Sequence, residues 1–157
     1  AAQGVTDPIG GRRSAPSAGA LYPLEAHLIA VRVMGLEPGV YRYAPERHAL
    51  LDTGTPADPE ALAYAALSQE SISTAPALLV LTAVFERSTR KYGERGVRYV
   101  YLEAGHAAEN VYLEAVALGL GTVAIGAFDD ERLRSVLGLP PQTRPVYLMP
   151  FGLPAGG

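Results

Sequence analysis

Two neighbouring residues, Lys91 and Tyr92, have side chains that are suited to proton transfer. Lys91 is the only lysine among 13 basic residues, and four arginines lie within seven residues of it. Arginine keeps its proton in a protein, whereas a lysine that is buried or crowded by positive charge can release it. Lys91, which lies beside Tyr92, is therefore a candidate general base. Two plainer interpretations stay open: a chance lysine on a solvated basic surface, or a patch that recognises anions.

A second stretch, GLGTVAIGAFDD at 119–130, is built mostly from small side chains. Gly119 and Gly121 are predicted to end a helix, and residues 122–128 to form a short buried strand. A strand without bulky side chains lets a flat ligand lie against bare backbone. The plainer alternative is a helix stop and a tight strand that bind nothing.

The segment 99–119 must position both stretches, because it joins them as one long helix of roughly 30 Å. His106 and Asn110 lie one turn apart on it, and we interpret them as polar residues of the core or of an interface. The apolar stripe of this helix consists of Val100, Ala104, Ala107, Ala108, Val111, Ala115 and Leu118. The many alanines would let a neighbouring backbone approach closely.

The other elements form a meander of hairpins followed by interleaved helices and strands, which predicts an α+β fold. Residues 1–23 are predicted as loop, and the basic segment 86–98 as a connection punctuated by glycines. Strands are expected at 25–34, 40–43, 48–51, 76–85 and 144–151, and further helices at 58–67 and 130–137. The sequence has no G-x-G-x-x-G between a strand and a helix and no P-loop, which argues against a Rossmann fold.

Composition restricts the possible functions. The 157 residues are expected to form one domain, and only 18% of them are charged, against about 25% in average soluble domains. We infer that a partner chain covers part of the surface. The net charge of −3 argues against a nucleic-acid partner, and the lack of cysteine and of histidines at metal-ligand spacing argues against a metal site. Without a signal-peptide pattern or a membrane-length apolar run, we expect a cytoplasmic protein with no membrane association.

Five motifs occur in the order that is seen in nitroreductase-like flavoproteins. They are APSAGALYPLE (15–25), GVYRY (39–43), KYGERG (91–96), EAGHAAENVYLEA (103–115) and GLGTVAIGAFDD (119–130). Over residues 3–154 the chain most resembles the SagB/ThcOx-type dehydrogenases, which oxidise thiazolines and oxazolines in modified peptides. The resemblance implies a mainly antiparallel sheet flanked by helices, with a long central helix. It also implies a homodimer that binds FMN between its two subunits.

The same resemblance implies roles for individual residues. The acid/base element is the adjacent pair Lys91 and Tyr92. Cofactor contacts are expected first from a loop, often donated by the partner subunit, that consists of Pro16, Ser17, Ala18 and Gly19. Gln69 is expected at the pyrimidine edge of the flavin. The segment expected to lie along the ring, with a backbone N–H towards N5, consists of Ala124, Ile125, Gly126 and Ala127.

The phosphate contacts of FMN are harder to assign. Family members carry an Arg/Ser-rich upstream segment that clamps the FMN phosphate, and many add a basic residue near the C-terminus. Neither feature is present in these 157 residues, so Arg13, with Arg12, is the candidate substitute. A fragment of a longer product and a member that has lost its cofactor are both left open.

The predicted function is that of an FMN-dependent dehydrogenase that oxidises a peptide azoline or a similar substrate. The substrate would give a hydride to flavin N5 and a proton to Lys91, with Tyr92 helping and oxygen restoring the flavin. Two alternatives are kept. One is a generic nitro- or quinone-reducing flavoprotein that is fed by NAD(P)H and has no defined base. The other is a cofactor-free dimeric scaffold that binds a peptide-modifying partner.

Overall fold

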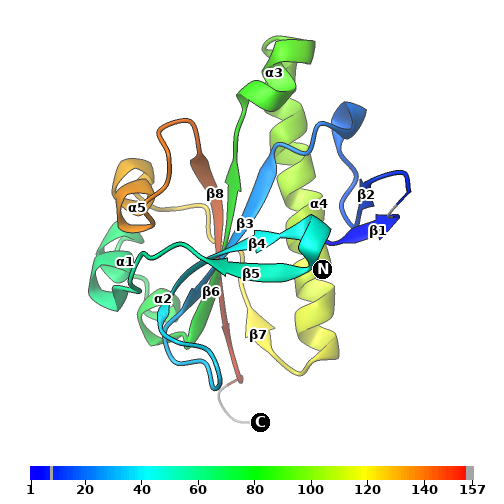
Figure 1. Cartoon of the computed structure of the whole chain (residues 1–157). Coiled ribbons are helices and arrows are strands. Elements are labelled where there is room, and N and C mark those ends of the chain that lie inside the picture. The colour runs from blue at the N-terminus through cyan, green and yellow to red at the C-terminus, as the bar shows by residue number, and fades with distance from the viewer. Residues whose placement is uncertain (8, 155–157) are drawn as a thin grey trace.

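A computed structural model describes residues 1–7 and 9–154 (Figure 1). Its centre is a six-stranded sheet in the order β5-β4-β3-β6-β8-β7, and each neighbouring pair is antiparallel. The strands are β3 (Leu24–Ala30), β4 (Gly39–Ala44), β5 (Ala49–Asp52), β6 (Ala77–Ala83), β7 (Gly121–Thr122) and β8 (Arg144–Gly152). Helices cover both faces of the sheet, so the α+β prediction is confirmed.

One face of the sheet is covered by the long helix α4 (Arg95–Ala117) (Figure 1). It begins four residues before the predicted start, and it buries Val100, Ala104, Ala107, Ala108, Val111 and Ala115, as the predicted stripe requires. Leu118 follows the helix and is exposed. The alanines pack with Leu24, Leu81 and Met149 of the sheet in one apolar cluster.

The opposite face is covered by three short helices, α1 (Pro59–Ala65), α2 (Glu70–Thr74) and α5 (Asp130–Val136). Asp58 caps α1 by accepting the Ala61 N–H at 2.9 Å, and Asp129 caps α5 by accepting the Arg132 N–H at 3.0 Å. These are the predicted helix starts, and each removes one unsatisfied N–H at its helix end. The core on this face is aliphatic: Ile29, Leu62, Ile72, Leu78, Leu133, Leu137 and Leu148.

The connection predicted at 86–98 is instead helical, which is a correction. Residues Glu86–Tyr92 form α3, and α4 begins at Arg95. The glycines join two helices rather than breaking the structure. Gly93 has a φ of 57° and ends α3. A Cβ on Gly96 would lie 2.8 Å from the carbonyl carbon of Ser88, so only glycine lets α4 pack this closely on α3.

Two further predictions need correction. Of the strand expected at 122–128, only β7 and an isolated bridge between Ile125 and Leu148 are formed. The other residues of this segment have no strand conformation. The predicted loop at 1–23 contains a short hairpin of β1 (Val5–Asp7) and β2 (Arg12–Arg13), and the one-turn 3-10 helix η1 (Ala18–Ala20). Elements this short leave no periodic pattern.

Three remaining expectations concern polar residues and membranes. Asn110 on α4 donates to the Ser14 carbonyl at 3.1 Å, whereas His106 is exposed on the same helix. Among residues 1–7 and 9–154, no three or more His, Asp and Glu side chains are grouped so that they could hold a metal ion. No helix in that part of the chain is long and apolar enough to cross a bilayer.

Candidate functional site

The predicted residues Gly19, Lys91 and Tyr92 lie together. Gly19 has a φ of 65°, and a Cβ at this position would be 2.6 Å from Tyr92 Oη and 2.9 Å from Lys91 Nζ. These distances place the two side-chain ends directly over Gly19, and the positive φ is what favours glycine at this position. The structure thus brings the predicted acid/base pair onto the predicted cofactor loop.

The helix α3 presents the pair at one end of α4 (Figure 1). The Tyr92 ring packs edge-on against Tyr99 with centroids 5.1 Å apart, which fixes its orientation. Lys91 Nζ lies 5.4 Å from the centroid of the Tyr92 ring. Lys91 is exposed and Tyr92 is half-buried. The burial expected around a lysine base is therefore not supplied by this chain on its own.

The 14–22 loop is tied to itself and to α4. Ser17 Oγ accepts the Tyr22 N–H at 2.9 Å, and the Ser17 carbonyl accepts the Ala20 N–H at 3.0 Å. Asn110 holds the start of the loop through Ser14. Pro16 is exposed and Ala18 is half-buried. The loop is a small ordered turn that offers Pro16, Gly19 and Ala20 to the surface.

Arg13 is occupied by contacts within the chain. Its Nη1 donates to Gln3 Oε1 at 3.0 Å, its Nη2 pairs with Glu46 Oε1 at 3.1 Å, and its guanidinium stacks on Tyr22 at 4.5 Å from the centroid. Arg12 lies 3.8 Å from Asp7. These contacts suit Arg13 to holding the loop, and a phosphate would have to compete for its N–H groups.

Gln69 belongs to a second group of residues, near the strand end 124–127. Its Nε2 donates to the Ala66 carbonyl and to the Ala127 carbonyl, both at 2.9 Å. Because both partners are acceptors, the amide nitrogen must point to them. The Oε1 atom then remains as an acceptor, which is the group needed to receive an N–H from a pyrimidine edge.

Two of the four backbone N–H groups of 124–127 donate hydrogen bonds within the chain. The Ala124 N–H donates to Tyr112 Oη at 2.6 Å, and the Ile125 N–H donates to the Leu148 carbonyl at 2.8 Å. Within the described residues, the N–H groups of Gly126 and Ala127 have no acceptor. Only these two can meet a ligand. A Cβ on Gly126 would have one neighbour, Tyr147 Cε1 at 3.9 Å, so the space above this backbone is open.

Comparison with known proteins identifies the family. A family model described as "Nitroreductase family" matches residues 1–153. The chain belongs to the nitroreductase family. It is accordingly an oxidoreductase, and the long helix with its mainly antiparallel sheet is the nitroreductase fold.

Three similar proteins illustrate the range of this family. MJ1384 of Methanocaldococcus jannaschii, a nitroreductase by name, is 49% identical over 97% of this chain and 75% of its own length. The microcin B17-processing protein McbC of Escherichia coli is 31% identical over 93% of this chain and 56% of its own. A chain of the E. coli McbBCD complex with truncated pro-MccB17 bound superposes with a TM-score of 0.83 at 28% identity, over 96% of this chain and 59% of that one.

Members of the nitroreductase family generally use a flavin, and the second group of residues fits one. A flavin ring needs open backbone along one face, a free N–H donor and a partner for its pyrimidine edge. Gly126 offers the open backbone, Gly126 and Ala127 the free N–H groups, and Gln69 Oε1 the acceptor.

Sequence reasoning missed two residues of α4, Glu103 and Tyr112. Tyr112 holds the strand end through Ala124, and Glu103 lies beneath Ser17. Burial raises the pKa of Glu103 to about 7, while a hydrogen bond from Ser17 and the charge of Arg13 act against it. The available signal was position: Glu103 falls in the buried stripe between Val100 and Ala107, where a charge is rare unless it has a task.

Proposed function

We propose that this nitroreductase-family chain is an FMN-dependent dehydrogenase of the SagB type that oxidises a peptide azoline or a closely related substrate. The observation that carries the proposal is the packing of Lys91 and Tyr92 over Gly19, which places the proposed acid/base pair next to the proposed cofactor loop. The likeness to McbC and to a chain of the McbBCD complex supports a peptide as the substrate. Because the chain spans little more than half of those proteins, their activities enter only as support.

The residues of the second group would hold the isoalloxazine. The Gly126 or Ala127 N–H would donate to the ring near N5, Gln69 Oε1 would accept from the pyrimidine edge, and the 16–19 loop would meet the ring from the other side. When bound, FMN supplies a two-electron acceptor for the hydride that the substrate loses.

Lys91 would take the proton that leaves the atom next to the hydride donor, so that the azoline ring loses one hydride and one proton and becomes aromatic. Tyr92 would orient the lysine, since its ring lies beside Nζ and is itself fixed by Tyr99. Closing the exposed face of Lys91 by a substrate or a second subunit would exclude water from the proton transfer. Molecular oxygen is the proposed final electron acceptor.

We propose that the active unit is a homodimer, because α4 leaves an apolar face uncovered. Leu102, Leu113 and Val116 recur at helical spacing and are 55%, 62% and 76% exposed. Nitroreductases are commonly dimers. In this arrangement Gly19 and Lys91 of one subunit would face Gly126 of the other.

The catalytic assignment is tested by Lys91→Arg, with Arg90→Lys as the matched control at an exposed neighbour on the same helix. Anaerobic reduction of bound flavin by an azoline peptide is followed at the flavin absorbance bands. Lys91→Arg keeps the charge but cannot act as a base, so we expect a loss of ~10²-fold or more, with flavin content unchanged. Tyr92→Phe should cost less. Equal rates in both swaps would favour the generic reductase.

The shared site is tested by mixing two inactive homodimers, Lys91→Arg and Gly126→Val. If the two groups meet across subunits, each mixed dimer has one site with both native groups. An equal mixture then recovers about a quarter of the wild-type activity per chain. If both groups of a site came from one subunit, mixing would restore nothing.

A second candidate is a nitro- or quinone-reductase fed by NAD(P)H, which the 49% identity to a nitroreductase by name favours. This activity needs no base and would survive Lys91→Arg. A third, the cofactor-free scaffold, is separated from both by the colour of the purified protein, since only a flavoprotein would show the flavin bands.

A further inference from the structure

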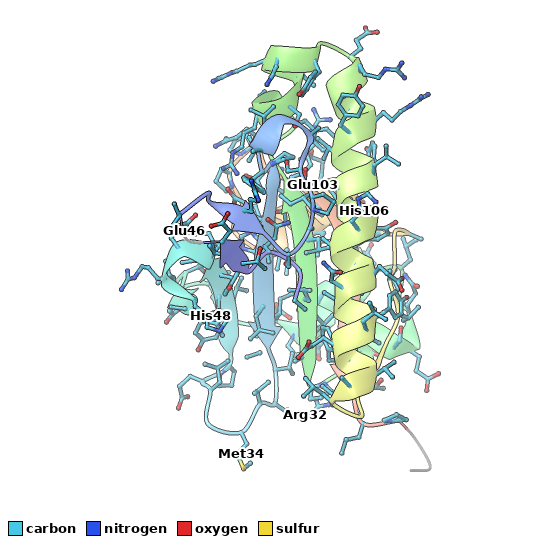
Figure 2. All side chains as sticks on the ribbon, turned by 90° about the vertical axis from the view of Figure 1, so that its right-hand side faces the viewer. Arg32, Met34, Glu46, His48, Glu103 and His106 are labelled. Carbon is cyan, nitrogen blue, oxygen red and sulfur yellow. The ribbon has the colours of Figure 1, made fainter. Side chains whose placement is uncertain are left out.

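The segment 17–22 has left-handed backbone at residues that are not glycine. Ala20 and Tyr22 have φ values of 54° and 45°, a region that residues with a Cβ adopt only at a cost. Both views show η1, the one-turn helix of this segment, below α3 and beside α4 (Figure 1, Figure 2). Strained backbone of this kind persists only where the surrounding structure holds it, and it concentrates at functional sites.

Three contacts hold Tyr22, one for each part of the residue. Its N–H donates to Ser17 Oγ at 2.9 Å, and its ring lies under the Arg13 guanidinium, 4.5 Å from the centroid. Its carbonyl accepts a hydrogen bond from Nη1 of Arg87 at 3.2 Å. The first two partners belong to the N-terminal segment, whereas Arg87 belongs to α3. Arg87 therefore links the strained turn directly to the helix that carries the proposed acid/base pair.

A second contact of Arg87 sets the direction of its guanidinium. Nη2 pairs with Glu25 Oε1, at the start of β3. The Arg87 and Glu25 side chains are 42% and 24% exposed, so this ion pair adds little to stability. Its contribution is geometric, because a planar guanidinium that is bound to a carboxylate through one N–H can present another to the Tyr22 carbonyl. The sheet, the turn and α3 therefore meet at one side chain.

The helix α3 contacts the turn at two points. Arg87 and Lys91 lie one helical turn apart and so project from the same face of α3. At one end of this face Arg87 binds the Tyr22 carbonyl. At the other end Lys91 Nζ and Tyr92 Oη lie 2.9 and 2.6 Å from the position that a Cβ on Gly19 would take. Fixing the first point restrains the second, because both belong to one seven-residue helix.

We propose that Arg87 is a positioning residue: by binding the Tyr22 carbonyl it fixes the placement of Lys91 and Tyr92 over the 16–19 loop. Its effect on turnover rests on the proposed function, whereas the link between the turn and α3 does not. In this role the geometry of the guanidinium matters more than its charge. Arg87→Lys keeps the charge but loses the planar fork that reaches both partners, so it should behave as a loss of the link.

Hydrogen exchange tests the link without flavin or substrate. The Tyr22 N–H donates to Ser17 Oγ, so its protection reports whether the turn keeps its strained form. Loss of a hydrogen bond from a charged donor should lower this protection about tenfold in both Arg87→Lys and Arg87→Gln. The Gly93 N–H, which donates to the Thr89 carbonyl at 2.8 Å, reports α3 itself and should be unchanged. Unchanged protection at Tyr22, or an equal loss at Gly93, would overturn the proposal.

Two further variants separate geometry from charge. Arg90→Gln is the matched control, since Arg90 is an exposed arginine three residues further along α3. It removes the same charge and should leave the protection of Tyr22 at the wild-type level. Glu25→Gln should have a smaller effect than Arg87→Gln, because Nη1 can still reach the Tyr22 carbonyl. If Arg90→Gln loosened Tyr22 as much as Arg87→Gln, loss of positive charge would be the cause and the proposal would fail.

Turnover distinguishes positioning from a merely structural role. With FMN saturating, Arg87→Lys should lower kcat for oxidation of an azoline peptide about tenfold, with KM unchanged. If Arg87 acts through Lys91, the same change should cost little in a Lys91→Arg background. Provided that Lys91→Arg is itself impaired, an unchanged kcat in Arg87→Lys, or losses that multiply in the double variant, would overturn the proposal. If exchange follows the prediction but Lys91→Arg keeps full activity, the proposed function fails and the link stands.

Discussion

On one face of the six-stranded sheet, three short helices bring leucine and isoleucine side chains to the core; on the other, α4 brings mostly alanines. Each face also buries one titratable group with an unpaired polar atom among the described residues: both ring nitrogens of His27, and Oε1 of Glu103. His27 on β3 pairs with Val80 in register and faces the short helices, whereas Glu103 lies on α4. The two faces are therefore stabilised by different means.

The aliphatic face derives its stability from large buried side chains that fill the core, and it lies away from Lys91 and Tyr92. The alanine face permits close approach, because α4 can lie near the sheet while Glu103, Asn110 and Tyr112 reach the two segments of the candidate site. A helix that must fix loops in place gains from short side chains and a few polar ones. This difference explains why α4 carries polar residues that support the site.

The largest effect on stability is expected from Leu133→Ala on the aliphatic face. Leu133 is fully buried, and its truncation leaves a cavity that should lower the free energy of unfolding by about 2–5 kcal/mol. The matched change on the other face, Ala104→Gly, removes one methyl group and should cost about 1 kcal/mol. Urea unfolding at one fixed protein concentration measures both. Equal costs would contradict the distinction between the faces.

Some of the elements on both faces could be predicted from the sequence. The stripe Val100 to Ala115 gave the long helix, and Asp58 and Asp129 gave the starts of two short ones. The helical nature of 86–92 was missed, because Gly93 and Gly96 were interpreted as loop residues. Gly93 instead ends α3 with a positive φ, and Gly96 allows a tight contact between two helices. That contact depends on tertiary structure, which local patterns do not record.

The candidate site could also be predicted in part. The contact of Gly19 with Lys91 and Tyr92, and that of Gln69 with Ala127, join residues that had been singled out separately. Glu103 and Tyr112 were not predicted, because a polar residue inside an amphipathic helix becomes meaningful only when its partner is known. The assignment of residues 124–127, 16–19 and 91–92 to flavin and proton transfer stays a prediction.

The second prediction uses the two buried titratable groups. Burial lowers the pKa of His27 from 6.5 to about 4, with Arg42 adding to the effect and Glu25 opposing it. Between these values the unfolded chain binds a proton that the folded chain does not. The contribution of His27 to stability should therefore fall by about 3 kcal/mol as the pH drops from 6.5 to 4.

Glu103 has the opposite sign, since its folded pKa is raised and stability is lost as the pH rises from 4.5 to about 7. Between pH 4.5 and 6.5 the changes in stability that the two groups cause should therefore cancel. Because the two contributions offset each other in the wild type, each variant is compared with the wild type by urea unfolding at pH 4 and pH 7. His27→Gln should gain about 3 kcal/mol on the wild type between pH 7 and pH 4. The control His48→Asn, at an exposed left-handed position, should show no such gain. An equal gain in both variants would exclude His27 as its cause.

The third prediction compares two glycines of α4. Gly96→Ala would bring a Cβ within 2.8–2.9 Å of Ser88 backbone atoms, and we expect a cost of about 1–3 kcal/mol. Gly105 has no atom within 4 Å of its Cβ position, so Gly105→Ala should stabilise by about 0.5–1 kcal/mol through helix propensity. Thermal unfolding of the pair shows whether α4 is held by close packing. A gain from both changes would show that the contact with α3 tolerates a methyl group.

The smallest effect on stability is expected at Gly126, although its effect on the cofactor should be large. The Cβ position is open except for Tyr147 Cε1 at 3.9 Å, so Gly126→Val should change the free energy of unfolding by no more than about 0.5 kcal/mol. The valine would occupy the space in which a flavin ring is proposed to lie, and FMN binding should be abolished. Val123→Ala, at an exposed position beside the same segment, should change neither quantity.

Flavin content after purification and an equilibrium titration with FMN measure the binding. Wild-type flavin content in Gly126→Val would remove 124–127 from the ring site and leave its open backbone unexplained. Loss of flavin together with unchanged stability would show that the alanine face has two separate roles, one in folding and one in binding the cofactor. Tyr112 would then hold a segment whose structure is complete without a ligand, and the bare Gly126 backbone would serve binding alone.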